Sequence, residues 1–199
     1  MPTQAQSRMQ VVRKEEKESK LRQFLQASLE TLAAGDIGAS REVLLVVRSL
    51  ESPALRAVAG LSAEIAATGR SLRTLVVLPD VASETAAALP LDLGSLDANF
   101  RQARNPRLID AHEQLVLAPA AIWIGDCMRR DPQKRDAFEL FDPTGATALW
   151  AARCFDRLWE RGEPLDVVRP LDAPSIDSIS QAAATAAAEA GSTSVLTRH

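Results

Sequence analysis

The sequence predicts an α/β protein built on one mixed sheet with helices packed against it. Residues 42–47 (EVLLVV) and 72–78 (LRTLVVL) are short apolar runs rich in β-branched residues, which is typical of strands buried on both faces. Between them, Ser52 and Pro53 favour the start of a helix and Gly69 favours its end. Strand, helix and strand in this order predict a βαβ unit, whose two strands are parallel and share one sheet.

The second part of the predicted sheet is an antiparallel hairpin followed by one more strand. Residues 112–118 alternate between two faces, and Ala118 and Pro119 can turn the chain back into a strand over 120–125. The segment DAFELF, residues 136–141, predicts the last strand of the sheet. Together with the βαβ unit, these segments predict a sheet with both parallel and antiparallel neighbours.

Helices are predicted on either side of these strands. In residues 11–34, leucines and Phe24 recur at helical spacing, and Glu16 and Lys20 form an i,i+4 pair. Residues 145–161 predict a closing helix with a wide apolar face, and a short helix is expected over 95–100. The charged run RKEEKESK indicates either a solvated helix face or a surface that binds a partner.

These patterns divide the chain into three parts. We expect an N-terminal helical segment over 1–39, an α/β domain over 40–164, and a loosely ordered tail over 165–199 whose alanine-rich stretch has little to bury. No apolar run approaches the ~18 residues that a membrane span needs.

The composition restricts the classes of function. The chain has 199 residues, 46% of them hydrophobic, and a net charge of −3. An acidic chain generates no overall field that attracts nucleic acid, so we do not expect a nucleic-acid partner. The two cysteines, Cys127 and Cys154, have no metal-type spacing and cannot form a disulfide framework, which favours a reducing cytoplasm. No motif for a metal or another cofactor is present, and we expect none.

Three short motifs within residues 40–162 give the chain a resemblance to one half of the phospholipase D superfamily. They are HEQ at 112–114, GDCM at 125–128, and Glu139. They stand where that family has His-x-Lys, Gly-Ser-x-Asn and a glutamate, in the same order of strands, hairpin and closing helix. The resemblance implies a phospholipase D-like half-domain preceded by an N-terminal helix, and a site composed of His112, Gln114 and Glu139.

The departures from the family pattern argue against catalysis. Family members use the histidine to attack phosphorus and the lysine to bind phosphoryl oxygens, but this chain has Gln114 in place of the lysine. Asp126 and Met128 replace the serine and asparagine, and Asp126 would repel phosphate if it faced the site. Losing one such stabilising donor costs on the order of 10²–10³ in rate. His112 could still act as a nucleophile or a base, or it could be kept for packing and hydrogen bonding.

A local basic cluster is the best sequence evidence for an anionic ligand. Arg107, Arg129 and Arg130 fall in predicted loops beside the site, with further arginines such as Arg101 nearby. Guanidinium groups match the geometry of phosphate and carboxylate. The alternative is ordinary pairing with neighbouring surface aspartates.

Three hypotheses about function follow. The first is a non-catalytic domain of this type that binds or regulates in the cytoplasm, with a phosphate-bearing ligand or a protein as its partner. The second is a divergent phosphodiesterase or nuclease that uses His112. The third is a structural module that acts through helix 11–34. A single half-domain with Trp123 on its hairpin and a wide apolar face on helix 145–161 also predicts an exposed apolar patch. The patch predicts a twofold homodimer in which the two His112 side chains approach each other, unless helix 11–34 or the tail covers it.

Overall fold

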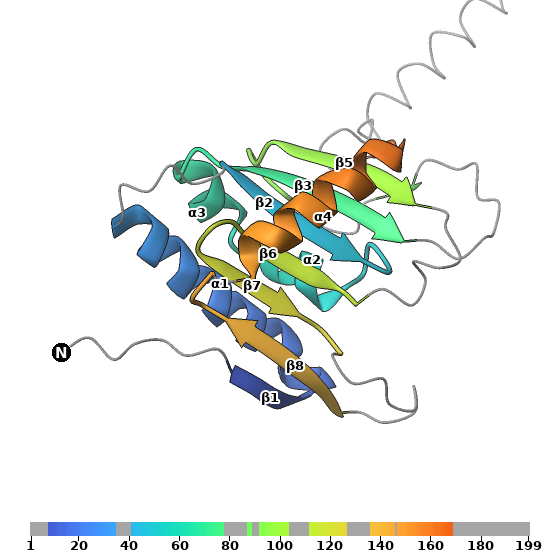
Figure 1. Ribbon diagram of the computed structural model, residues 1–199. Coiled ribbons are helices and arrows are strands. Elements are labelled where there is room, and N and C mark those ends of the chain that lie inside the picture. Colours follow the sequence, from blue (N-terminus) through green and yellow to red (C-terminus); the bar gives the residue numbers. More distant parts are fainter. Residues whose placement is uncertain are drawn as a thin grey trace, which may run out of the picture.

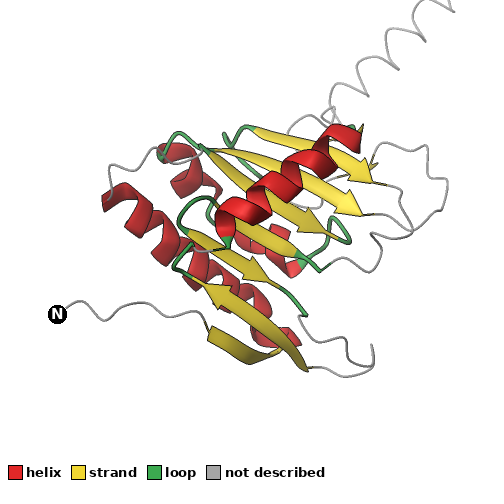
Figure 2. Cartoon of the chain, viewed as in Figure 1, coloured by secondary structure: helices red, strands yellow, loops and turns green. Residues whose placement is uncertain are grey.

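The computed structural model describes residues 8–34, 41–77, 87–88, 92–103, 112–126, 136–145 and 147–168. Figures 1 and 2 show one large twisted sheet, with α4 across one face and α1, α2 and α3 on the other. The helices are η1 (Lys14–Glu16), α1 (Lys17–Ala34), α2 (Pro53–Ala59), α3 (Ser62–Ala67) and α4 (Ala148–Arg161). No helix among the described residues is long and apolar enough to cross a membrane.

The main sheet has eight strands. In spatial order they are β1 (Arg8–Arg13), β8 (Asp136–Asp142), β7 (Ala121–Ile124), β6 (Gln114–Leu117), β2 (Glu42–Val47), β3 (Ser71–Val77), β5 (Ala98–Ala103) and β9 (Glu163–Pro164). Two further strands, β4 (Ala87–Ala88) and β10 (Val167–Val168), pair with each other in parallel.

The predicted mixed sheet is confirmed. β2 and β3 are parallel neighbours, as a βαβ unit requires, and β5 continues the parallel part. β6, β7 and β8 follow on the other side of β2, each antiparallel to its neighbour. The five segments expected to be strands therefore lie in one α/β sheet flanked by helices.

Each face of the sheet has its own core. Val43, Leu45 and Val47 point from β2 into a core with α1, α2 and α3, whereas Leu44 and Val46 point into a second core under α4. Because both faces of β2 are buried, its sequence is a continuous apolar run and does not alternate.

The N-terminal segment differs from its predicted structure. Residues 11–13 do not begin a helix, because β1 occupies Arg8–Arg13 and pairs with β8 along its whole length. The β-branched Val11 and Val12 favour this extended backbone. α1 then places Leu21 and Leu25 in the core. Residues 8–34 thus contribute to the same sheet and core as the rest, and the division of the chain at residue 39 stays a prediction.

Three other expectations need correction. The helix expected over 95–100 is absent, since Ala98–Ala103 forms β5 on the edge of β3 and obtains backbone hydrogen bonds there. The helix after Pro53 is interrupted at Gly60, between α2 and α3. α4 begins at Ala148 and not at residue 145, because Gly145 has a φ of +69° that no right-handed helix contains.

Trp123 does not form an exposed patch. Its side chain is fully buried in the core beneath α1. The helix therefore covers Trp123, which was the expected alternative to covering it in a dimer. Trp150 and Leu149, at the start of α4, are the large apolar side chains on that helix that stay exposed. Within the described residues, Trp123 is therefore not part of an open apolar surface, whereas the start of α4 leaves large apolar side chains exposed.

Candidate functional site

The N-terminus of α1 places one cation between two carboxylates of the sheet. Lys17 Nζ lies 3.0 Å from Glu139 Oε1 and 3.5 Å from Glu113 Oε2. The same ammonium lies 5.0 Å from the centre of the Trp123 ring. Lys17 thus connects α1 to β8 and to the residue before β6 through charge as well as packing.

Glu139 has two partners and no access to solvent. The indole Nε1 of Trp123 donates to its Oε2 at 3.0 Å, while Lys17 holds the other oxygen. Burial raises the pKa of Glu139 above its ordinary 4.5, and the neighbouring Lys17 and Trp123 offset only part of that rise. A buried carboxylate with both oxygens engaged is arranged to hold α1 on the sheet.

Gly125 is explained by the same cluster. A Cβ at this position would lie 2.6 Å from Cζ2 of Trp123, so a larger residue would displace the indole. The Gly125 N–H donates to the Glu113 carbonyl at 2.9 Å, which closes the base of the β6–β7 hairpin. The next residue, Asp126, has a φ of +51°. The glycine that resembles a family motif therefore has a packing role in this chain.

Gln114 lies on the opposite face of the sheet from Glu139. Its cross-strand neighbours are Ile124 and Val46, and Val46 belongs to the core under α4. Ile124 is in turn paired with Leu140, so Glu139, one residue earlier, points to the α1 side. The structure does not bring these two predicted site residues together.

His112 precedes β6 and is partly buried. Its Nδ1 is enclosed and has no hydrogen-bond partner among the described residues. Buried polar atoms are nearly always paired, so an unpaired ring nitrogen is notable. His112 remains the candidate site residue whose environment leaves a reactive atom unengaged.

The predicted anion-binding arginines cannot be placed. Arg107, Arg129 and Arg130 lie outside the described residues, as do Cys127 and Met128. Arg101 was expected in a loop beside the site, but it lies in β5. Its guanidinium donates to the Trp159 carbonyl at 2.6 Å and stacks over the Trp159 ring, so it holds the end of α4.

Sequence reasoning missed Lys17, Glu113 and Trp123 as one cluster. The alternation of residues 112–117 did place Glu113 on the face of Leu115 and Leu117, which the structure bears out. Lys17, however, sits in a charged run that indicates a solvated helix face. Its partners lie about 100 residues further along the chain, and local spacing gives no signal of them.

Comparison by sequence finds no relative of this chain. No family model matches it, and no curated protein matches it.

Comparison by structure does find similar folds. Nuc from Salmonella typhimurium, a phospholipase D family member, has a TM-score of 0.46 at 8% identity, over 80% of this chain and 98% of its own. NucT from Helicobacter pylori has a TM-score of 0.45 at 9% identity, over 80% of this chain and all of its own (100%).

A third similar structure is TrmBL2, an archaeal chromatin protein with a novel mode of DNA binding. Its TM-score is 0.44 at 16% identity, over 79% of this chain and 54% of its own, so this chain spans about half of it. One of these three structures, Nuc, is a phospholipase D family member. With all three TM-scores below 0.5, nothing about the activity or ligand of this chain follows from them.

Proposed function

We propose that this chain is a non-catalytic phospholipase D-like domain that works as a cytoplasmic binding or regulatory module for an anionic ligand. The observation that supports this most is the position of Glu139. Its carboxyl group is buried against Lys17 and Trp123, on the opposite face of the sheet from Gln114. Among the described residues, His112 therefore has neither a cation at the position of Gln114 nor an available carboxylate from Glu139.

Electrostatics support the same proposal. Phosphoryl transfer depends on positive groups aimed at the charge that develops in the transition state. Gln114 is neutral, and the Lys17 ammonium is already balanced by Glu113 and Glu139. A histidine without such groups could form at best a slow site.

The test is hydrolysis of model phosphodiesters, phospholipids and DNA by the full chain and by a His112→Ala variant. We expect equal background rates for the two proteins. A Gln114→Lys variant restores the family's cation, and we expect it to stay inactive because Glu139 faces the other side. Robust hydrolysis that disappears in His112→Ala would reject the proposal.

One observation favours a divergent phosphodiesterase as the second candidate. The enclosed Nδ1 of His112 has no hydrogen-bond partner among the described residues, so no structural hydrogen bond there accounts for this histidine. That candidate predicts hydrolysis by the wild type that is lost in His112→Ala, which the same assay would detect.

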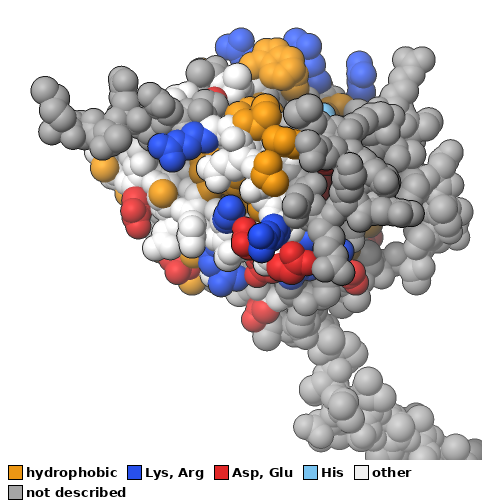
Figure 3. All heavy atoms as spheres, turned by 90° about the horizontal axis from the view of Figure 1, so that it is seen from below, with side chains coloured by type: hydrophobic (Ala, Val, Ile, Leu, Met, Phe, Trp, Pro, Cys, Tyr) orange, Lys and Arg blue, Asp and Glu red, His pale blue; other side chains and the backbone are white. Residues whose placement is uncertain are grey.

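A structural module is the third candidate, and here the structure moves the contact surface away from α1. The apolar side of α1 is buried in the core. Met9 and Val11 on β1 are instead exposed, by 56% and 51%. Figure 3, a view from the β1 side, shows hydrophobic side chains gathered on this surface.

We propose a homodimer that forms through β1, in place of the surface around Trp123 that the sequence predicted. β1 lies at one edge of the sheet, and no described residue pairs with its outer side. Met9 and Val11 lie across from Leu140 and Phe138, so the apolar surface continues onto β8. An unpaired edge with apolar side chains is a template for strand pairing, and a twofold axis would satisfy both copies at once.

We do not propose nucleic acid as a ligand, because the chain has a net charge of −3 and binding to the phosphate backbone depends on positive charge. Fluorescence anisotropy with labelled duplex DNA at two salt concentrations tests this. Saturable binding that weakens steeply with added salt would show that a local basic surface outweighs the overall charge.

A further inference from the structure

A cleft opens between α1 and the β1–β8 edge of the sheet, away from His112 in the fold. η1 is a single turn, so α1 begins close to the end of β1, and the two elements diverge from that point. The space between them has a volume of about 410 Å³, within the usual range for sites that bind small molecules. Its lining residues are Arg8, Gln10, Lys20, Gln23, Phe24, Phe141 and Pro143.

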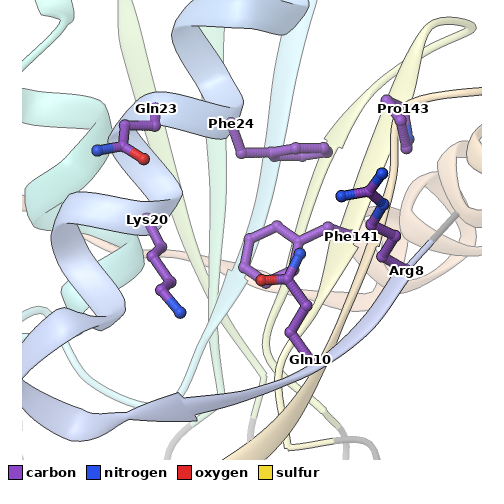
Figure 4. A pocket seen from close by; sticks show the side chains of 7 residues that line it. All are labelled: Arg8, Gln10, Lys20, Gln23, Phe24, Phe141 and Pro143. Atoms are coloured by element: carbon purple, nitrogen blue, oxygen red, sulfur yellow. The ribbon is translucent and has the colours of Figure 1, made fainter. Parts of the chain in front are cut away.

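The lining residues form two sets, one on β1 and one on α1, and the members of each set share one side of their element. Arg8 and Gln10 are alternate residues of β1, so they point to the same side of the sheet. Lys20, Gln23 and Phe24 are three and four apart on α1 and share one helix face. Figure 4 shows the two sets on either side of the cleft, with Phe24 and Phe141 between them.

The two phenylalanine rings form an apolar floor. Phe24 and Phe141 meet edge to face, with 5.3 Å between ring centres and an interplanar angle of 74°. Phe24 is only partly buried, so it offers aromatic surface to the cleft. A flat apolar group could add to this pair in the offset or edge-on arrangements that aromatic rings prefer.

The rim of the cleft is positive. Arg8 and Lys20 contribute two cations from opposite sides, and none of the described residues that line the cleft carries a carboxylate. Among the described residues, Lys20 pairs with the exposed Glu16 at 3.5 Å, and no carboxylate pairs with Arg8. A guanidinium presents the fork that carboxylate and phosphate accept, while the amides of Gln10 and Gln23 can donate or accept.

We infer that this cleft binds a small organic anion with an aromatic body, its carboxylate or phosphate held by Arg8 and Lys20 and its ring on Phe24 and Phe141. This inference rests on the proposed role as a binding module and gives that role a site. It does not depend on whether His112 hydrolyses anything, because the cleft and His112 involve different residues.

The experiment is titration of the full chain with phenyl phosphate, benzoate, adenosine monophosphate and inorganic phosphate, followed by calorimetry and by NMR of the backbone amides. We expect an aromatic anion to bind and to shift the amides of β1 and α1. Inorganic phosphate should bind more weakly, because it lacks the ring. The ratio of the dissociation constants of phenyl phosphate and benzoate shows which head group the site prefers. Adenosine monophosphate tests whether a larger ring system fits.

Two variants and two controls make the result specific. Arg8→Gln and Lys20→Gln should each weaken binding about tenfold or more, since each removes a charge-assisted hydrogen bond. Lys14→Gln removes an exposed cation nearby that does not line the cleft, and it should leave binding unchanged. His112→Ala should also bind normally, which separates this site from the one tested by hydrolysis.

Three results would overturn the inference. One is the absence of binding by every aromatic anion at millimolar concentration. Another is equal weakening by Lys14→Gln and Arg8→Gln, which indicates general attraction to charge. The third is inorganic phosphate binding as tightly as phenyl phosphate, which shows that the aromatic floor is not used.

Discussion

Lys17 and Glu139 form an ion pair that joins the first turn of α1 to β8, with 3.0 Å between Nζ and Oε1. The Glu139 side chain has no exposed surface, and that of Lys17 is 15% exposed. Such a pair stabilises little compared with a well-packed apolar pair, but removing one partner leaves the other charge buried and uncompensated. Removing either Lys17 or Glu139 alone should therefore cost more stability than the intact pair contributes.

Lys17→Met should lower the free energy of unfolding by about 3 kcal/mol at pH 7, because it leaves the Glu139 carboxylate without its cation. Urea denaturation followed by tryptophan fluorescence measures this. Adding Glu139→Gln to Lys17→Met should recover most of the loss, because a neutral amide can still accept from Trp123. Lys20→Met, which breaks only the exposed pair with Glu16, should cost under about 1 kcal/mol. Equal losses for the two lysines would contradict a special role for Lys17.

The stability contributed at Glu139 should depend on pH. Burial, offset only in part by Lys17 and Trp123, raises the pKa of this carboxyl above its unfolded value of 4.5. The folded chain therefore binds this proton more tightly than the unfolded chain, and stability is lost as pH rises from 4.5 through the raised pKa. We expect the wild type to lose free energy of unfolding relative to Glu139→Gln over that window. A difference that stays constant between pH 4 and 8 would refute this.

Gly145→Ala should lower the free energy of unfolding by at least about 3 kcal/mol, through backbone strain and overpacking combined. Gly145 has a φ of +69°, and a Cβ there would lie 1.6 Å from the carbonyl oxygen of Pro119. Gly69→Ala is the matched control, because its φ is +68° but nothing lies within 4 Å of its Cβ position. That control should cost only about 1 kcal/mol. Thermal denaturation of both variants gives the comparison, and similar losses would mean that the contact with Pro119 can relax.

Val11→Lys should convert the proposed dimer to a monomer. The substitution places a charge on the exposed side of β1, a device that natural sheets use to prevent edge pairing. Light scattering of the wild type should give twice the chain mass of 21.4 kDa at micromolar concentration, and the variant should give the single mass. Leu149→Lys, at an exposed apolar site on α4, should leave the dimer intact. A wild type of single mass at all concentrations would remove the β1 dimer from consideration.

Strands that are buried on both faces could be predicted from local sequence. The polar residues in 42–47 and 72–78 are Glu42, at the start of the first segment, and Arg73 and Thr74 in the second. β5 and β1 could not be predicted in this way. Their sequences, ANFRQA and RMQVVR, mix polar and apolar residues, and only pairing with β3 and β8 makes them strands.

The candidate site was predicted less well, because strand register decides which face of the sheet each residue points to. Glu139 occurs at the expected distance along the chain, but alternate residues of a strand face opposite sides of a sheet. The pairing of Leu140 with Ile124 turns Glu139 toward α1, away from Gln114. Spacing along a sequence gives a position on a strand, whereas the facing direction depends on partners that are distant in the chain.

The pairing of β1 with β8 has a consequence for how the chain is made. Arg8 pairs with Phe141 and Arg13 with Asp136, so β1 leaves the ribosome well before the strand that it pairs with. Contacts this distant in sequence require a large loop closure and form late. Until β8 is synthesised, β1 has neither edge paired, and nascent strands in that state are prone to associate with other chains.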